Sequence, residues 1–485
     1  MLFLKPGVLL SGRKCSRPVY TYFMMSRNLW CLLLIAGLLA SCGEGPDTTE
    51  TNDDDQNLQP AATATDATFP EKIAAGTIYE VNIRQHTPEG TINAFAEDLP
   101  RLQEMGIKML WIMPVQTIGT KNRKGSLGSY YSIRDYREVN PEFGNLDDFK
   151  SLVDKAHELG MYVILDWVPN HTAWDHPWIT EHKDYYAQNE AGEVIYEADW
   201  TDIALLDHTN PATRAAMIDD MKYWVTEADI DGFRCDHAGH EIPLYFWEEA
   251  TSVIDPLKDL FWLAEWDGAR MHLEFDATYA WELLHLTEDV AKGEHNADDL
   301  DEWIRKDLQE YGQAPIRLTM ITNHDENSWA GTLNERYGES QKAFATFVFT
   351  AYGVPMLYSG QEAGLDKRLR FFEKDTIDWS DPNQLQPFYT QLVQFRLDNE
   401  AVWGGLYGGM PVRINDNANV YAFKREKNGN TVIGILNFSA TSQSADLTDS
   451  SINGTYTDYF TGEEYTLESD GSLELGPWEY LLFAR

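Results

Sequence analysis

The chain has 485 residues, of which 43% are hydrophobic and 24% are charged, and this composition excludes a chain that is disordered throughout. Its 78 acidic residues against 38 basic ones give a formal net charge of −40. That balance disfavours nucleic acid as a partner, because phosphate backbones require a basic protein surface.

The amino terminus has the pattern of a targeting segment. Leu29–Ala40 is an apolar run of twelve residues, which is too short to span a bilayer and has the length of a signal-peptide core. Arg27 precedes the run, and Leu39-Ala40-Ser41-Cys42 ends it. This ending resembles a bacterial lipobox, in which the cysteine becomes the lipidated first residue. We therefore expect residues 1–42 to be a signal peptide, and the exported protein to be anchored to a bacterial membrane through Cys42. The alternative is a buried apolar helix.

Residues 43–72 are expected to form a flexible acidic tether between the anchor and the folded body. Residues 43–68 contain seven acidic side chains, no basic ones and no aromatic ones. Such a stretch cannot bury enough apolar surface to order itself. Lipid anchor, tether and folded body thus follow one another along the chain.

Short apolar runs alternate with amphipathic stretches from about residue 73. Helical spacing is clearest in Asp147–Leu159, which ends before Gly160, and in Ala212–Ala228. Strands separated by helices predict a parallel sheet, and eight such units predict a closed (β/α)8 TIM barrel over residues 73–398. The expected strands are Thr77–Asn82, Lys108–Ile112, Tyr162–Trp167, Gly232–Cys235, Phe261–Ala264, Ala277–Tyr279, Ile316–Ile321 and Met356–Tyr358.

Two regions depart from this alternation. The segment of about residues 171–206 has no clear period and predicts a short domain inserted after the third strand. Residues 399–485 are rich in β-forming residues with short turns and predict a C-terminal β-sandwich. The strands expected there are Val420–Lys424, Thr431–Phe438, Gly454–Asp458 and Glu479–Ala484.

Polar clusters follow four of the expected barrel strands. Catalytic side chains of such barrels lie where the strands end, so the four clusters would face one crater. Each cluster alone has a structural explanation, such as a turn or a helix cap, and the functional reading depends on finding four together. They are Asp166-Trp-Val-Pro-Asn170-His171, Gly232-Phe-Arg234-Cys-Asp236, Glu265-Trp266 and Asn323-His324-Asp325.

The order and spacing of these clusters resemble the α-amylase family of retaining glycoside hydrolases, whose signatures are DxxxNH, GFRxD, a Glu after the fifth strand, and NHD. Two further segments, Gly128–Tyr136 and Gly353–Glu362, add to the resemblance. The family's barrel, inserted domain and C-terminal β-sandwich agree with the elements read from the residues. The resemblance implies cleavage of α-1,4-glucosidic bonds in starch-like α-glucans or maltooligosaccharides, without a required cofactor.

Glycosidic chemistry requires one carboxylate at the anomeric carbon and one protonated carboxyl at the leaving oxygen. By resemblance these are Asp236, the nucleophile, and Glu265, the general acid and base. The resemblance also implies that Asp325 forms hydrogen bonds with the sugar hydroxyls. Arg234 shares a strand face with Asp236 and is expected to keep it ionised. Glu265 has to hold its proton instead, so its surroundings should be apolar or negatively charged.

The remaining site residues are expected around the same sugar ring. By resemblance, the substrate is contacted by His171, His324 and Arg234. Tyr131 is expected to stack on the sugar ring. Asp166 and Asn170 are expected behind them as organisers of the site. Outer stacking platforms could come from Trp174, Trp200 and Trp329.

Two positions depart from the family's pattern. Gly239 stands where many members have a lysine, in GFRxDxxKH, and Leu205 falls where many have a calcium-binding aspartate. Leucine has no oxygen to offer a hard cation, so the family's structural calcium site is not predicted here. Asn170 and His240 could still be partial ligands.

Two alternatives stay open at this point. One is a different activity within the family, cyclomaltodextrinase-like or transglycosylating, because the three carboxylates alone do not separate these reactions. The other is a non-catalytic surface protein that binds glucans, which the intact set of Asp236, Glu265 and Asp325 disfavours. Endo or exo action is not determined by the motifs.

Overall fold

We describe a computed structural model of the chain, which defines residues 68–380 and 385–485. The expected signal peptide, Cys42 and most of the expected tether lie outside the described residues. Within the described ranges, no helix is long and apolar enough to cross a membrane.

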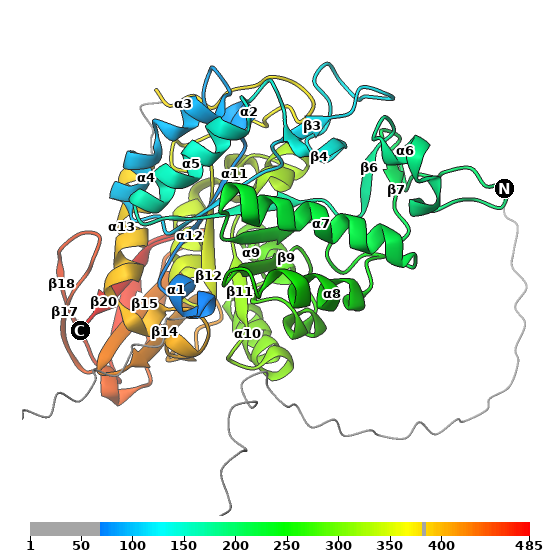
Figure 1. The fold of residues 1–485 in the computed structure, drawn as a ribbon. Coiled ribbons are helices and arrows are strands. Elements are labelled where there is room, and N and C mark those ends of the chain that lie inside the picture. The colour runs from blue at the N-terminus through cyan, green and yellow to red at the C-terminus, as the bar shows by residue number, and fades with distance from the viewer. Residues whose placement is uncertain (1–67, 381–384) are drawn as a thin grey trace, which may run out of the picture. The chain divides into compact units, whose positions relative to one another are not determined.

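A closed barrel of eight parallel strands forms the centre of the structure (Figure 1), in the order β1-β12-β11-β10-β9-β8-β5-β2. All eight expected strands are present, and the TIM barrel is confirmed. The strands are β1 (Ile78–Val81), β2 (Met109–Ile112), β5 (Tyr162–Trp167), β8 (Gly232–Cys235), β9 (Phe261–Ala264), β10 (Ala277–Tyr279), β11 (Ile316–Thr319) and β12 (Val354–Tyr358).

The barrel strands are buried on both faces because successive side chains alternate between them. Ile78, Trp111 and Leu318 belong to a cluster that fills the barrel interior. Their strand neighbours, such as Tyr79 and Leu110, belong to a second, larger cluster packed against the helices. Strands covered in this way read as continuous apolar runs, which is why the sequence located them.

Helices cover the outside of the barrel. Asn145 and Asp148 form a capping box at the start of α5 (Leu146–Glu158), and Asn210 caps α7 (Pro211–Ala228). Both helices were expected to within about a residue. The other α-helices are α1 (Phe69–Ala74), α2 (Ile83–His86), α3 (Ile92–Ala96), α4 (Leu99–Met105), α8 (Leu244–Ile254), α9 (Trp281–Lys292), α10 (Ala297–Tyr311), α11 (Leu333–Tyr337), α12 (Gln341–Thr350) and α13 (Gln386–Asp398).

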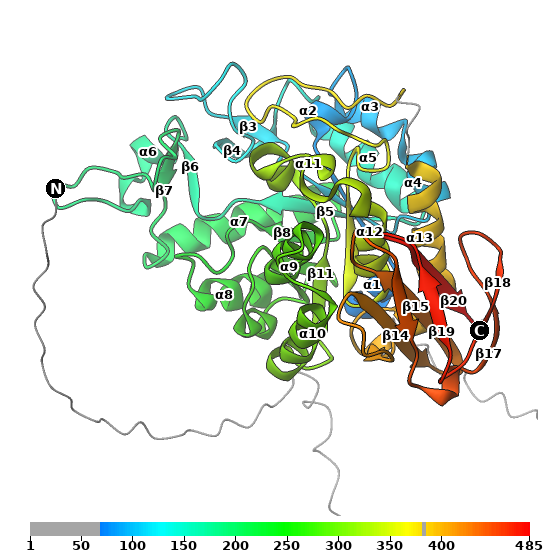
Figure 2. The same cartoon turned by 180° about the vertical axis from the view of Figure 1, so that it is seen from behind.

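Two excursions leave the barrel after its second and third strands. After β2, the chain forms an antiparallel pair of β3 (Gln116–Ile118) and β4 (Ile133–Val139), which the sequence analysis did not predict. After β5, strands β6 (His171–Ala173) and β7 (Ile203–Leu205) pair antiparallel and enclose the short helix α6 (Trp178–Glu181). Figure 2 shows both excursions outside the ring of barrel strands.

The C-terminal region is all-β, as expected. It has a four-stranded sheet of β13 (Val412–Arg413), β14 (Val420–Lys427), β15 (Asn430–Asn437) and β20 (Tyr480–Ala484). Two small sheets complete it: β16 (Gln443–Asp446) with β19 (Ser472–Leu475), and β17 (Gly454–Thr457) with β18 (Glu464–Leu467). One apolar core unites the three sheets and includes Ile433, Ala445 and Leu467.

Candidate active site

A pocket of about 540 Å³ lies at the carboxyl ends of the barrel strands. Five of the residues predicted for the site line it, namely Tyr131, His171, Asp236, Glu265 and Asp325. The residues that share the wall with them are Lys124, Ser129, Asp199, Trp200, Asp202, Ile203, His237, Trp329, Phe371 and Phe372. The four motifs, which are far apart in the chain, thus meet at one place.

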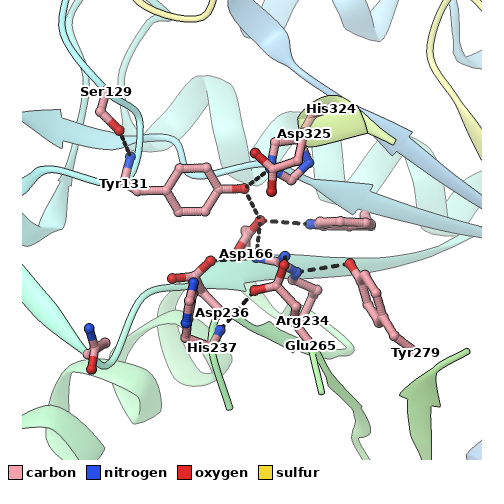
Figure 3. Close-up of polar contacts among 12 residues, drawn as sticks. Ser129, Tyr131, Asp166, Arg234, Asp236, His237, Glu265, Tyr279, His324 and Asp325 are labelled. Carbon is pink, nitrogen blue, oxygen red and sulfur yellow. Dashed lines mark hydrogen bonds and ion pairs between the residues drawn. The ribbon is translucent and has the colours of Figure 1, made fainter. Parts of the chain in front are cut away.

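Arg234 on β8 is the centre of the polar network (Figure 3). Its Nη1 donates to Asp166 Oδ1 and to Asp236 Oδ1, both at 3.0 Å, and its Nη2 forms an ion pair with Glu265 Oε1 at 2.7 Å. The guanidinium is completely buried, and it packs 4.7 Å from the centre of the Trp111 ring. One cation therefore serves three carboxylates in a site that water scarcely reaches.

The sharing of Arg234 sets the protonation of the two candidate catalytic carboxyls. Burial and the negative charge of Glu265 raise the pKa of Asp236 well above its usual value. Burial acts on Glu265 as well, but Arg234 and His237 outweigh it and lower the pKa of Glu265. The two carboxyls therefore titrate as a coupled pair around Arg234, and the directions of their pKa shifts are opposite to those expected from the sequence. The reason is that the guanidinium lies closer to Glu265 and also has to neutralise Asp166.

A second network connects Tyr131 to the floor of the barrel. The Tyr131 hydroxyl donates to Asp166 Oδ2 at 3.1 Å and lies 2.8 Å from Nε2 of His324. The Nδ1 of His324 contacts the buried carboxylate of Glu80. Burial alone would lower the pKa of His324, but Asp325 and Glu80 together raise it to about 9. His324 is therefore a cation at neutral pH, with Asp325 Oδ2 3.3 Å from its Nε2.

His171 differs from His324 in that its ring is uncharged. Burial and the nearby His237 lower the pKa of His171 to about 3, so its imidazole is neutral. Its Nε2 lies 3.1 Å from the backbone oxygen of Tyr131, and its Nδ1 lies 3.3 Å from the Asn170 side-chain nitrogen. These partners fit a ring that carries its hydrogen on Nε2 and accepts on Nδ1. Asn170 thus lies behind His171, as expected.

Two of the three expected aromatic platforms lie at the pocket. Trp200 lines it with its ring 5.2 Å from that of His237, and Trp329 donates to Asp325 Oδ1 at 3.2 Å while 58% of its surface is exposed. Trp174 is not among the lining residues, and its indole N–H donates to the backbone oxygen of Thr201. Trp329 thus offers an open ring face beside Asp325.

Sequence reasoning missed several residues of the site. Glu80 carried a detectable signal, because an ionisable residue inside the apolar run Ile78–Val81 has to find a buried partner. Lys124, Phe371 and Phe372 carried none, since their approach to the pocket depends on the paths of long loops.

The two departures from the family's pattern have local structural explanations. A Cβ atom at Gly239 would lie 2.5 Å from the Trp266 ring, so that ring packs directly on the glycine backbone. Leu205 is paired with His171 in the β6–β7 ladder, and His240 forms a close ion pair with Glu197. Among the described residues, no group of three or more His, Cys, Asp or Glu side chains is placed to hold a metal ion. Leu205 offers no side-chain oxygen where many family members have an aspartate, so this position does not fit the family's calcium site.

Comparison with known proteins places this geometry in a family. The catalytic domain of α-amylase matches residues 50–201 and 188–400, and the C-terminal domain of maltogenic amylase matches residues 412–482. The chain belongs to the α-amylase family. It is therefore a glycoside hydrolase.

Relatives within the α-amylase family differ in activity. α-Amylase 2 of Dictyoglomus thermophilum is 26% identical over 436 residues, covering 84% of this chain and 72% of the relative. A cyclomaltodextrinase of a Bacillus species is 24% identical, covering 78% and 74%. Among solved structures, the noncanonic maltogenic α-amylase AmyB of Thermotoga neapolitana superposes with a TM-score of 0.78 at 29% identity, covering 85% of this chain and 99% of that one.

Proposed function

We propose that the protein hydrolyses α-1,4-glucosidic bonds in starch-like α-glucans or maltooligosaccharides, with retention of configuration at the anomeric carbon. One observation carries this proposal: Asp236 and Glu265 are held by the same buried guanidinium and face one pocket. Two carboxyls presented together to a sugar are what a retaining mechanism needs.

Asp236 attacks the anomeric carbon in the first step, while Glu265 donates its proton to the leaving glycosidic oxygen. The carbon–oxygen bond breaks, and a glycosyl ester of Asp236 forms. Glu265 then takes a proton from water, whose oxygen attacks the same carbon and releases Asp236. Both carboxyls return to their starting states, and one water molecule has been added across the bond.

The proton that the coupled pair shares has to reside on Glu265 for the first step. A glycosidic oxygen beside Glu265 accepts a hydrogen bond only from the protonated carboxyl, and this favours the neutral form of Glu265. Arg234 is then free to neutralise Asp236, 3.0 Å from its Nη1. Arg234 thus supports either distribution of the proton, and the bound sugar selects one.

The other lining residues are suited to hold a neutral sugar ring. Asp325 offers a carboxylate to sugar hydroxyls, and neutral His171 offers a hydrogen-bonding edge. The Tyr131 ring is fixed by its bonds to Asp166 and His324, so it presents a preorganised face for stacking.

The test is a product analysis of the purified enzyme and its Asp236→Asn variant with soluble starch, maltoheptaose and a cyclodextrin. We expect starch or maltoheptaose to be hydrolysed, the first product to carry the α-anomer in proton NMR spectra, and the variant to lose about 10³-fold or more of kcat. A preference for the cyclodextrin would favour a cyclomaltodextrinase-like activity. Binding of starch without Asp236-dependent turnover of any substrate would contradict the proposal.

We also propose that the enzyme is exported and lipid-anchored through Cys42. The apolar run and the lipobox-like ending support this, although both lie outside the described residues. In a bacterial expression host, the native protein should fractionate with membranes and incorporate labelled fatty acid, and Cys42→Ala should do neither. Equal membrane association of both forms would contradict the anchor.

A further inference from the structure

One wall of the pocket comes from a loop that the catalytic motifs do not include. Residues 119–127, here called the strap, connect β3 to β4 and contribute Lys124 to the pocket lining. The Lys124 ammonium donates to the backbone oxygen of Asp199 at 2.8 Å and lies 3.4 Å from Asp202 Oδ1. The strap is thereby joined to the segment inserted after β5.

The other side of the strap is joined to the loop that follows β12. The backbone N–H of Leu127 donates to the Phe372 oxygen at 3.1 Å, and that of Ser126 donates to Glu373 Oε1 at 2.9 Å. The Lys124 ammonium also lies 6.0 Å from the centre of the Phe372 ring. The strap therefore bridges two loops that start from different barrel strands.

The strap is closely packed against the residues on both sides of it. A Cβ atom at Gly125 would lie 2.5 Å from Phe372 Cβ, and one at Gly119 would lie 2.3 Å from Ala173 Cβ. Arg123 donates from Nε to the Gly119 oxygen at 2.7 Å, which braces the loop internally. A loop held at this density does not open without breaking several contacts at once.

The positions of the carboxylates indicate which end of the substrate the strap faces. Glu265 has to lie beside the leaving part of the chain, so the retained sugars extend away from it, past Asp325. The lining residues on that side are Trp329, Phe371 and Phe372. The centre of the Trp329 ring lies 5.3 Å from that of Phe371 and 6.0 Å from that of Phe372. Lys124, whose ammonium lies 6.0 Å from the centre of the Phe372 ring, borders this wall.

We propose that the strap closes the pocket at the non-reducing end of the substrate, so that the enzyme acts in the exo mode and releases products of one or two sugar units. This inference rests on the proposed α-glucan hydrolysis. One ring fits among Tyr131, His171 and Asp325, and a second stacks on the aromatic wall before Lys124 ends the path. The pocket of about 540 Å³ lies within the roughly 300–1,000 Å³ of sites that enclose small ligands.

The test compares maltoheptaose with a derivative whose terminal 4- and 6-hydroxyls at the non-reducing end are capped by an ethylidene group. We expect the uncapped substrate to yield mono- or disaccharide from the first turnovers, and the capped one to be cleaved at least about tenfold more slowly. Equal rates, with products of mixed length, would overturn the inference and leave the proposed hydrolysis intact. Absence of Asp236-dependent turnover of either substrate would instead refute the proposed function on which the inference rests.

Two variants test whether the strap causes the slower cleavage of the capped substrate. Lys124→Ala removes the two contacts that Lys124 makes with the inserted segment, and Glu373→Gln weakens the contact with Ser126. Both should raise the ratio of capped to uncapped turnover and lengthen the first products. The matched control is Lys306→Ala, which removes an exposed lysine of α10 that pairs with Glu302 and should leave the ratio unchanged. An unchanged ratio in both strap variants, with native thermal stability, would overturn the role of the strap.

Discussion

Arg234→Gln is the most informative single change, because it removes the one cation that the three buried carboxylates share. Each contact of about 3 Å is worth about 5 kcal/mol at an effective dielectric constant of 20, before the cost of desolvation is deducted. Breaking a buried ion pair costs about 3–5 kcal/mol of stability. For a folded region of about 420 residues, this lowers Tm by roughly 3–6 °C.

Arg234→Gln should also shift the pH dependence of kcat/KM in a predictable direction. An opposite charge at this distance lowers a carboxyl pKa by about 1–3 units, so its loss raises the pKa values of the Asp236–Glu265 pair. The reaction needs one of the two carboxyls ionised. The acid limb of the kcat/KM profile should therefore move to higher pH by about 1–3 units, and kcat/KM at neutral pH should fall by about 10³-fold or more.

Arg317→Gln is the matched control for this measurement. Arg317 on β11 is also buried and bridges two carboxylates, Asp267 and Asp307, neither of which lines the pocket. Its loss should reduce Tm by a similar amount and leave the acid limb in place. An acid limb that shifts equally in both variants, or in neither, would refute the reasoning that Arg234 sets the protonation of the catalytic pair.

Three further predictions follow from other contacts. Tyr131→Phe removes the hydroxyl that bonds Asp166 and His324, and should lower kcat/KM by about 10–100-fold with little change in Tm; native activity would contradict a positioning role. Gly239→Ala would place a Cβ atom 2.5 Å from the Trp266 ring and should lower Tm, because the ring packs on the glycine backbone; an unchanged Tm would contradict that packing. The pKa of His324 is raised to about 9 in the folded state from about 6.5 unfolded, so its stabilisation is complete below pH 6.5 and is lost as the pH rises through 9. The Tm difference between native protein and His324→Gln should therefore shrink between pH 6.5 and 9.5 in calorimetry, and a constant difference would contradict the raised pKa.

The barrel was predictable because its strands are buried on both faces and interrupted by capped helices. The β3–β4 pair was not, since the buried residues of β4 recur at every third position (Ile133, Tyr136 and Val139) instead of every second, and its partner has only three residues. A strand so short leaves too little pattern in the sequence. The same holds for β13, β16, β18 and β19, whereas β17 was expected over Gly454–Asp458.

The residues of the site likewise divide into those that the sequence could predict and those that it could not. Residues directly after a strand, such as Asp236 and Glu265, could be placed because the barrel fixes where strands end. Lys124 and Phe372 lie on long loops, and their distance from the catalytic carboxyls follows from tertiary contacts alone. Charge states were the least predictable feature, because Asp236 and Glu265 contact the same guanidinium and their titrations are coupled.

The shared guanidinium has a consequence for selectivity. Glu265 has to hold the proton of the coupled pair when the glycosidic oxygen is in place, and a poorly placed oxygen does not favour that protonation state. A substrate that fills the pocket up to the strap brings that oxygen beside Glu265 and favours the proton there. Binding energy from sugar rings far from the reacting bond is thus converted into the correct protonation state. By this argument, capping the non-reducing end should lower kcat as well as affinity, because a displaced substrate no longer favours the proton on Glu265.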